Sequence, residues 1–139
     1  MKLRVWHEIM AMAATVVLMA GQLHAAGQKV RITGIYSDLY FNQEGGDLLG
    51  NEIFIVYASG GYVAFVQQSQ GEPQMPSVVP VSIDGDTISF TVPDPSGGTD
   101  EYKGRISVAG FVGTLQHQPA RGEPAQRAIR LKRKKSYWE

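Results

Sequence analysis

Few residues of this chain belong to the types that carry most enzyme and metal chemistry. The 139-residue sequence has no cysteine and three histidines. His7 and His24 lie in a predicted leader, so His117 is the one histidine of the predicted mature chain. A single imidazole without thiolates excludes most zinc cages and makes any Ser-His-Asp triad depend on His117. Because His117 ends a predicted strand beside a Gln-Pro loop, we expect an exposed histidine without a catalytic role.

Carboxylates are the other candidates for chemistry, as an acid–base pair or as oxygen ligands for calcium. They gather in two glycine-containing stretches, which hold Asp84 and Asp86, and Asp94, Ser96, Asp100 and Glu101. Aspartate is also common in turns, where its side chain bonds to the local backbone, and this simpler explanation covers both stretches. The sequence contains no nucleophile elbow, phosphate loop or paired zinc-ligand spacing. We therefore predict that the protein is not an enzyme and has no catalytic residue, metal or cofactor, with a carboxylate-dependent hydrolase as the enzymatic alternative.

The N-terminus has the three parts of a secretory signal peptide. Lys2 and Arg4 supply the positive start, Ile9 to Ala20 is an uncharged and mostly apolar run, and a plausible cleavage region ends at Ala25-Ala26. A membrane anchor is the alternative, but a spanning helix needs about 20 apolar residues and this run is shorter. We expect residues 1–26 to be removed after Ala25 or Ala26. The mature protein would then be periplasmic or secreted, without stable membrane insertion.

From Val30 onward the pattern is typical of antiparallel β-structure. Its clearest part is Val79 to Ile83 and Thr87 to Val92, two alternating runs around an Asp-Gly turn. Apolar residues occupy one side of each run, and serine and threonine occupy the other, which predicts a sheet with one buried face. The further predicted strands are 30–41, 48–57, 62–67, 102–108, 111–115 and 127–133.

About eight antiparallel strands joined mostly by short turns favour a small up-and-down β-barrel, because closure removes exposed sheet edges. A two-sheet β-sandwich is the alternative, although its crossovers need longer connections than most of these turns provide. The length fits one domain, which we place at residues 27–133, followed by a basic and aromatic tail at 134–139. The longer loops 69–76, 93–99 and 118–126 are where recognition would concentrate.

Cations gather at the C-terminal end, from Arg130 to Lys135, next to Tyr137 and Trp138. Such a cluster can bind an anionic surface, such as lipid headgroups or nucleic acid. Charges at the end of a last strand also protect its edge. Most carboxylates lie earlier in the chain and would repel an anionic partner, so we favour the protective role and expect no nucleic-acid partner.

Two short motifs resemble those of the calycin superfamily of lipocalin-like barrels. Gly34-Ile35-Tyr36 matches the Gly-x-aromatic motif of the first strand, with Tyr in place of the usual Trp, and Arg130 and Lys132 match the basic positions of the last strand. In calycins the aromatic plugs one end of the barrel and the basic side chain packs across it. Residues 46–56 and 134–138 are also similar to a group of small exported bacterial proteins of unassigned function. The calycin resemblance implies binding of a small apolar ligand, or inhibition of a protease by an N-terminal arm.

The interior of the barrel decides between a ligand cavity and a filled core. Large side chains predicted to favour a filled core are Ile55, Phe65, Ile83, Phe90, Tyr102 and Leu115, whereas Gly104 and Gly113 would open space if they point inward. We predict a non-catalytic binding protein for a small apolar or amphipathic ligand, with candidate wall residues Tyr57, Phe65, Phe90 and Tyr102. The alternative is a periplasmic protein-interaction or inhibitor module that uses the arm near Gly27-Gln28 or the loop 69–76.

Overall fold

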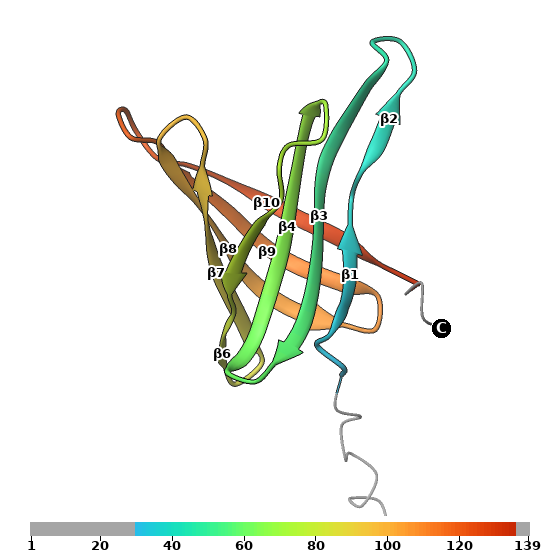
Figure 1. Cartoon of the computed structure of the whole chain (residues 1–139), viewed down its shortest axis with the longest axis vertical. Helices are drawn as coiled ribbons and strands as arrows, with labels where there is room; N and C mark the ends of the chain where they lie inside the picture. The colour runs from blue at the N-terminus through green and yellow to red at the C-terminus, as the bar shows by residue number, and fades with distance from the viewer. Residues whose placement is uncertain (1–29, 136–139) are drawn as a thin grey trace, which may run out of the picture.

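The computed structural model describes residues 30–135, which form an antiparallel all-β structure (Figure 1). The predicted leader, its cleavage positions, the arm at Gly27-Gln28 and the aromatic end of the tail lie outside the described residues. The strands are β1 (Gly34–Ser37), β2 (Tyr40–Asn42), β3 (Asp47–Ala58), β4 (Gly61–Gly71), β5 (Ser77–Pro80), β6 (Ser82–Asp84), β7 (Thr87–Asp94), β8 (Gly98–Ser107), β9 (Gly110–Gln118) and β10 (Ala125–Lys134). Between residues 30 and 135 no helix is long and apolar enough to cross a membrane.

The strands form one sheet that curves round on itself. Its order is β5-β4-β3-β1-β10-β9-β8-β7-β6, with β2 paired to β3. β5 and β6 stand at opposite ends of this order, yet only Val81 separates them in the chain. The segment made of β5, Val81 and β6 thus crosses the barrel wall once. Its first half, β5, pairs with β4, and its second half, β6, pairs with β7, so this segment nearly closes the barrel. When β1 is counted with β2 and β5 with β6, the chain makes eight passes, which confirms the up-and-down barrel and not the two-sheet sandwich.

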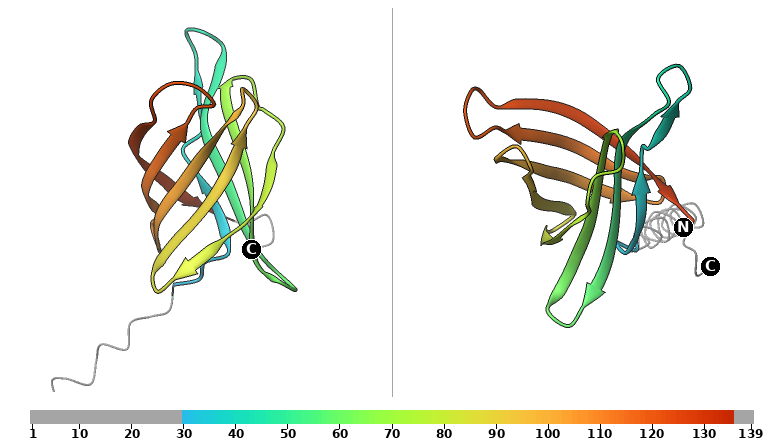
Figure 2. Two further views of the ribbon diagram at one scale, coloured as in Figure 1. Left: turned by 90° about the vertical axis from the view of Figure 1, so that its left-hand side faces the viewer. Right: turned by 45° about the horizontal axis from the view of Figure 1, so that its top comes forward.

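The barrel is open at one end. In Figure 1, β3 and β4 run close to vertical, and β8, β9 and β10 cross them at a steep angle. The β2–β3 turn and the β9–β10 turn lie on opposite sides of the upper end, and they remain far apart in the right-hand view of Figure 2.

Short turns at the predicted positions join most neighbouring strands. Ser59-Gly60 connects β3 to β4, and Gly85-Asp86 connects β6 to β7, where Gly85 has a φ of 60°. Only glycine adopts such a φ without a steric cost, which is why an Asp-Gly pair marks this turn in the sequence. The predicted loop at 93–99 is shorter than expected, since β7 continues to Asp94 and β8 begins at Gly98. The extra residues are in strand because they extend the β7–β8 ladder.

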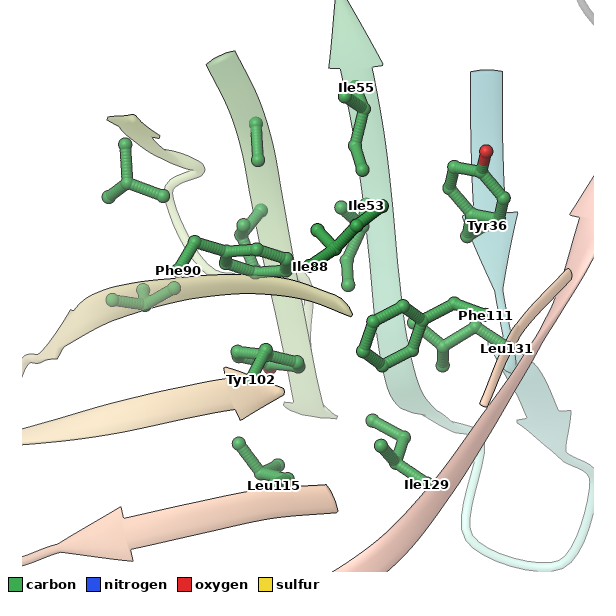
Figure 3. Close-up of a cluster of buried hydrophobic side chains, with 14 residues drawn as sticks. Tyr36, Ile53, Ile55, Ile88, Phe90, Tyr102, Phe111, Leu115, Ile129 and Leu131 are labelled. Carbon is green, nitrogen blue, oxygen red and sulfur yellow. The ribbon is translucent and has the colours of Figure 1, made fainter. Parts of the chain in front are cut away.

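A core of 14 buried apolar side chains fills the middle of the barrel (Figure 3). Tyr36, Tyr102 and Phe111 are the largest, and each is at most 1% exposed. The Phe90 and Tyr102 rings stack with centroids 4.9 Å apart. Inward positions alternate along β7 as Ile88, Phe90 and Val92, which confirms the predicted buried face of that strand. The middle of the barrel is therefore a packed core.

Gly104 and Gly113 do not open space, contrary to the prediction. They are direct partners across β8 and β9. A Cβ atom at Gly113 would lie 2.1 Å from the Lys103 carbonyl oxygen, and one at Gly104 would lie 2.9 Å from the Phe111 ring. The missing side chains thus let the two backbones approach closely and let Phe111 cover them.

Tyr36 and Arg133 pack together toward the other end of the barrel. They are partners across β1 and β10, and the Arg133 guanidinium carbon lies 4.8 Å from the Tyr36 ring centroid. Arg133 donates hydrogen bonds to the Tyr36 hydroxyl (2.7 Å) and to the Thr33 carbonyl (3.1 Å). Burial raises the pKa of Tyr36 to about 12 although Arg133 opposes this shift. The aromatic was predicted correctly, but the assigned basic residues were wrong: Arg130 and Lys132 are exposed, because inward positions of β10 are Ile129, Leu131 and Arg133.

Candidate functional site

A cleft of about 650 Å³ lies at the open end of the barrel. Strands β3 and β4 form one side of it through Leu49, Asn51 and Gln68, and β7 to β10 form the other side. Polar residues lie on both sides, at inward positions next to the apolar core. The sheet ladder fixes the backbone of each of these strands, so the lining side chains have rigid supports.

Hydrogen bonds connect the two sides across the floor of the cleft. The Tyr102 hydroxyl donates to Asn51 Oδ1 at 2.9 Å. Gln68 Nε2 donates to Tyr102 (3.1 Å) and to Asp100 Oδ2 (2.6 Å). Asn51 donates its backbone N–H to Asp38 Oδ1 at 2.6 Å, which extends the network to the break between β1 and β2. Buried polar groups with partners on several strands hold a single arrangement, so this floor is preorganised.

Asp100 and His117 form the most distinctive pair in the network. They are direct partners across β8 and β9, and His117 Nδ1 lies 2.8 Å from Asp100 Oδ1. Asp94, at the end of β7, brings its Oδ2 to 3.8 Å from the same nitrogen. Asp100 is 6% exposed, whereas the His117 side chain is 37% exposed toward the cleft. His117 is therefore partly exposed near the end of a strand, as predicted, but the sequence did not indicate that the register places it opposite a buried acid.

The electrostatics of the cleft follow from burial and from hydrogen bonds. Burial raises the pKa of Tyr102 to about 12, and the Asp100 charge adds to this shift while the Gln68 hydrogen bond opposes it. Hydrogen bonds from the side chain and backbone of Ser96 lower the pKa of Asp94. Asp38 also lines the cleft, as does Arg127. The site thus contains three carboxylates together with one arginine and one histidine.

Catalysis by a Ser-His-Asp triad has no support in this arrangement. Within residues 30–135, the Ser96 hydroxyl donates to Asp94, and the hydrogen bond of His117 goes to Asp100. An Asp–His pair orients an imidazole, but a triad also needs a serine hydroxyl bonded to the second ring nitrogen. What the arrangement offers is a set of fixed donors and acceptors, which suits binding.

The four predicted wall residues separate into two groups. Tyr57 is 68% exposed beyond the end of the barrel, and Phe65 is 40% exposed on the outer face, where it contacts Phe54. Phe90 and Tyr102 point inward, but both belong to the core beneath the cleft. Of the four, only the Tyr102 hydroxyl reaches the network at the floor of the cleft.

Phe65 was misplaced because the β4 sequence 61–66 is apolar on both faces, so its composition does not show which face is buried. The pairing settles the question: Phe65 lies between Phe54 and Val78 in an apolar row on the outer surface. Ile83, another predicted inward residue, is 38% exposed and lines a second cavity of about 590 Å³ at the opposite end of the barrel from the cleft. Ile55, Phe90, Tyr102 and Leu115 were predicted correctly as core residues.

The sequence interpretation missed Asn51 and Gln68. Both follow the alternation of their strands, since Asn51 precedes the buried Ile53 by two residues and Gln68 follows the buried Val66 by two. A polar residue that continues an inward apolar face is a signal for a buried network or a site, and this signal was available in the sequence.

Comparisons with known proteins add no relative to this description. No protein-family model, no curated protein and no solved structure matches the chain. The calycin resemblance therefore stays a prediction from two short motifs, and any function must be argued from the cleft itself.

Proposed function

We propose that this protein is a non-catalytic binding protein that takes a small amphipathic ligand into the cleft at the open end of the barrel. The observation that carries the proposal is the preorganised polar floor, in which Asn51, Gln68 and Tyr102 hydrogen-bond across the barrel above a filled core. Concave sites with a few convergent polar groups are typical of small-molecule binding. Polar groups that already hydrogen-bond to one another across the barrel need little rearrangement when a ligand arrives.

The distribution of polarity favours an amphipathic ligand over a purely apolar one. The middle of the barrel is occupied by apolar side chains such as Phe90 and Phe111, and the cleft of about 650 Å³ lies at the polar end. A ligand there would place polar groups against the floor, and it would place an apolar part against Leu49, Leu115 and the half-exposed Tyr40. The predicted leader supports a periplasmic or extracellular place of action, where such a ligand would be captured.

A protein-interaction or inhibitor role is the alternative to ligand binding. The loop predicted for it is held against β4, since Gln74 donates its backbone N–H to the Gln68 carbonyl at 2.9 Å. Beside this loop, the outward row of Phe54, Phe65 and Val78 offers apolar surface. The row by itself names no partner, so the cleft carries the proposal.

A tryptophan at Leu49 tests the cleft. Leu49 lines it, so we expect Leu49→Trp to fill the space beside the floor and to abolish co-purification of a bound small molecule. The measurement is native mass spectrometry of the protein purified gently from its own host, followed by denaturation and identification of anything released. The matched control is Leu48→Trp, because alternation turns the neighbouring side chain to the other face of the same strand. Equal ligand occupancy in both variants, or a wild-type chain that carries nothing, would contradict the proposal.

A further inference from the structure

We propose that Asp94, Asp100 and His117 bind one divalent transition-metal ion of the zinc type on the β7–β9 side of the cleft. Their ligand atoms lie within 4.8 Å of one another. The sequence suggested Asp94 and Asp100 only as possible oxygen ligands for calcium, and it did not place His117 beside them, because three ligands from three strands have no recognisable spacing along the chain. The site can be tested with the metal ion alone, so it does not depend on an organic ligand.

The sheet holds the three residues together. Asp100 pairs directly with His117, and Val92, two residues before Asp94, pairs with Asp100. Because side chains two residues apart share a face, Asp94 lies beside this pair on the inner surface. The backbones of all three residues are therefore held by strand pairing. Their relative positions are fixed more rigidly than those of acidic residues on a loop.

The spacing of the ligand atoms can be compared with the spacings that a metal ion and an ammonium group require. A tetrahedral metal with ligands at about 2.1 Å separates neighbouring ligand atoms by roughly 3.4 Å. An ammonium group that donates hydrogen bonds of about 2.8 Å separates its acceptors by roughly 4.6 Å. His117 Nδ1 lies 3.8 Å from Asp94 Oδ2, which is near the value for a metal. Its distance of 2.8 Å from Asp100 Oδ1 is that of a direct hydrogen bond, which a metal ion would have to replace.

A residue outside the cluster orients one of the ligands. Gln68, from the opposite side of the barrel, donates to Asp100 Oδ2 at 2.6 Å and leaves Oδ1 toward His117. Carboxylate ligands of protein metal sites are commonly held in this way by a hydrogen bond to the non-ligating oxygen. Gln68 is thus a positioning residue for Asp100.

The local charge also favours a cation. Asp100 is a buried carboxylate, and the ion pairs recorded within residues 30–135 join Asp94 and Asp100 only to His117. A buried carboxylate is costly unless a positive charge or hydrogen bonds compensate it. Gln68 and His117 supply part of this compensation for Asp100, and a divalent ion between the two acids would add to it.

The donor set indicates the class of metal. One imidazole nitrogen and two carboxylate oxygens suit zinc, cobalt or nickel, whereas calcium needs six to eight oxygens. Three protein ligands leave a fourth position open toward the cleft, where a water molecule or a donor atom of the proposed ligand would bind. This last step alone rests on the proposed function.

The site can be tested by titrating the metal-free chain with Zn²⁺ and measuring the heat of binding by isothermal titration calorimetry. We expect one strong site per chain, with binding weakened about tenfold or more in His117→Gln and in Asp100→Asn, and weakened also in Gln68→Met. Glu101→Gln is the matched control, because Glu101 is exposed on the opposite face of β8 and its loss should leave affinity unchanged. Co²⁺ in place of Zn²⁺ should give the visible absorption of a site with nitrogen and oxygen ligands.

The same experiment can overturn the proposal. Absence of stoichiometric Zn²⁺ binding, Ca²⁺ binding of equal strength, or unchanged affinity in His117→Gln would each exclude the site. His117 is partly exposed, so its substitution keeps the test valid if Asp100→Asn fails to fold. Leu49→Trp, which fills another part of the cleft, should still bind Zn²⁺, and this separates failure of the metal site from failure of the ligand-binding proposal.

Discussion

Gly113→Ala is expected to destabilise the barrel by about 3 kcal/mol or more, although it adds a single methyl group. The new Cβ atom would lie 2.1 Å from the Lys103 carbonyl oxygen and 2.6 Å from Gly104 Cα. Both are backbone atoms of the neighbouring strand, so no side-chain rotation can relieve the overlap. β8 and β9 must therefore separate, and because Gly113 pairs with Gly104 next to the core, this separation disturbs the packing of the core.

Urea unfolding followed by circular dichroism measures this loss of stability. Val112→Ala is the control, because Val112 is the neighbouring residue on β9 and is 45% exposed on the outer face. We expect that change to cost about 0.5 kcal/mol, as is usual for a surface substitution. Equal stabilities of Gly113→Ala and Val112→Ala would show that the two backbones do not approach as closely as described.

Local patterns in the sequence were sufficient to predict the fold. Alternation along Thr87 to Val92 shows which face is buried, and glycine in the Asp-Gly and Ser-Gly pairs marks where the chain reverses. Short reversals between consecutive strands force neighbours in sequence to be neighbours in the sheet, and this leads to a meander. The break between β5 and β6 at Val81 could not be predicted. It lets one segment pair with β4 on one side and with β7 on the other, and where such a break falls depends on the curvature of the whole sheet.

The candidate site was less predictable, because it depends on register. His117 and Asp100 are 17 residues apart and meet because Gly104 pairs with Gly113 in the same ladder. A shift of one residue would turn one of the two side chains to the outer face. The same reason explains why the basic partner of Tyr36 was assigned to the wrong residues of the last strand, since only the register places Arg133 opposite it. Residue types alone therefore suggested turn aspartates and an isolated histidine.

Tyr102 links the stability of the fold to the site, and it predicts how the protein responds to alkali. Its pKa is about 12 in the folded chain and 10.0 in the absence of the protein environment. As pH rises, the unfolded chain loses this proton first, so the unfolded state binds fewer protons between these values and becomes favoured. The contribution is fully present below pH 10.0 and is lost as pH rises through about 12. A shift of this size corresponds to about 3 kcal/mol.

Tyr102→Phe should therefore reduce the alkaline loss of stability, measured as the free energy of unfolding in urea at successive pH values. Near neutral pH the variant should be less stable by about 1–3 kcal/mol, because Asn51 Oδ1 loses its donor and Gln68 loses an acceptor. Tyr36 also has a raised pKa, so part of the alkaline dependence should persist. Tyr57→Phe is the control, since that side chain is 68% exposed and its removal should not change the pH dependence. If Tyr102→Phe and wild type lost stability in parallel above pH 10.0, Tyr102 would not be buried in its neutral form, and the floor of the cleft would be open to water instead of preorganised.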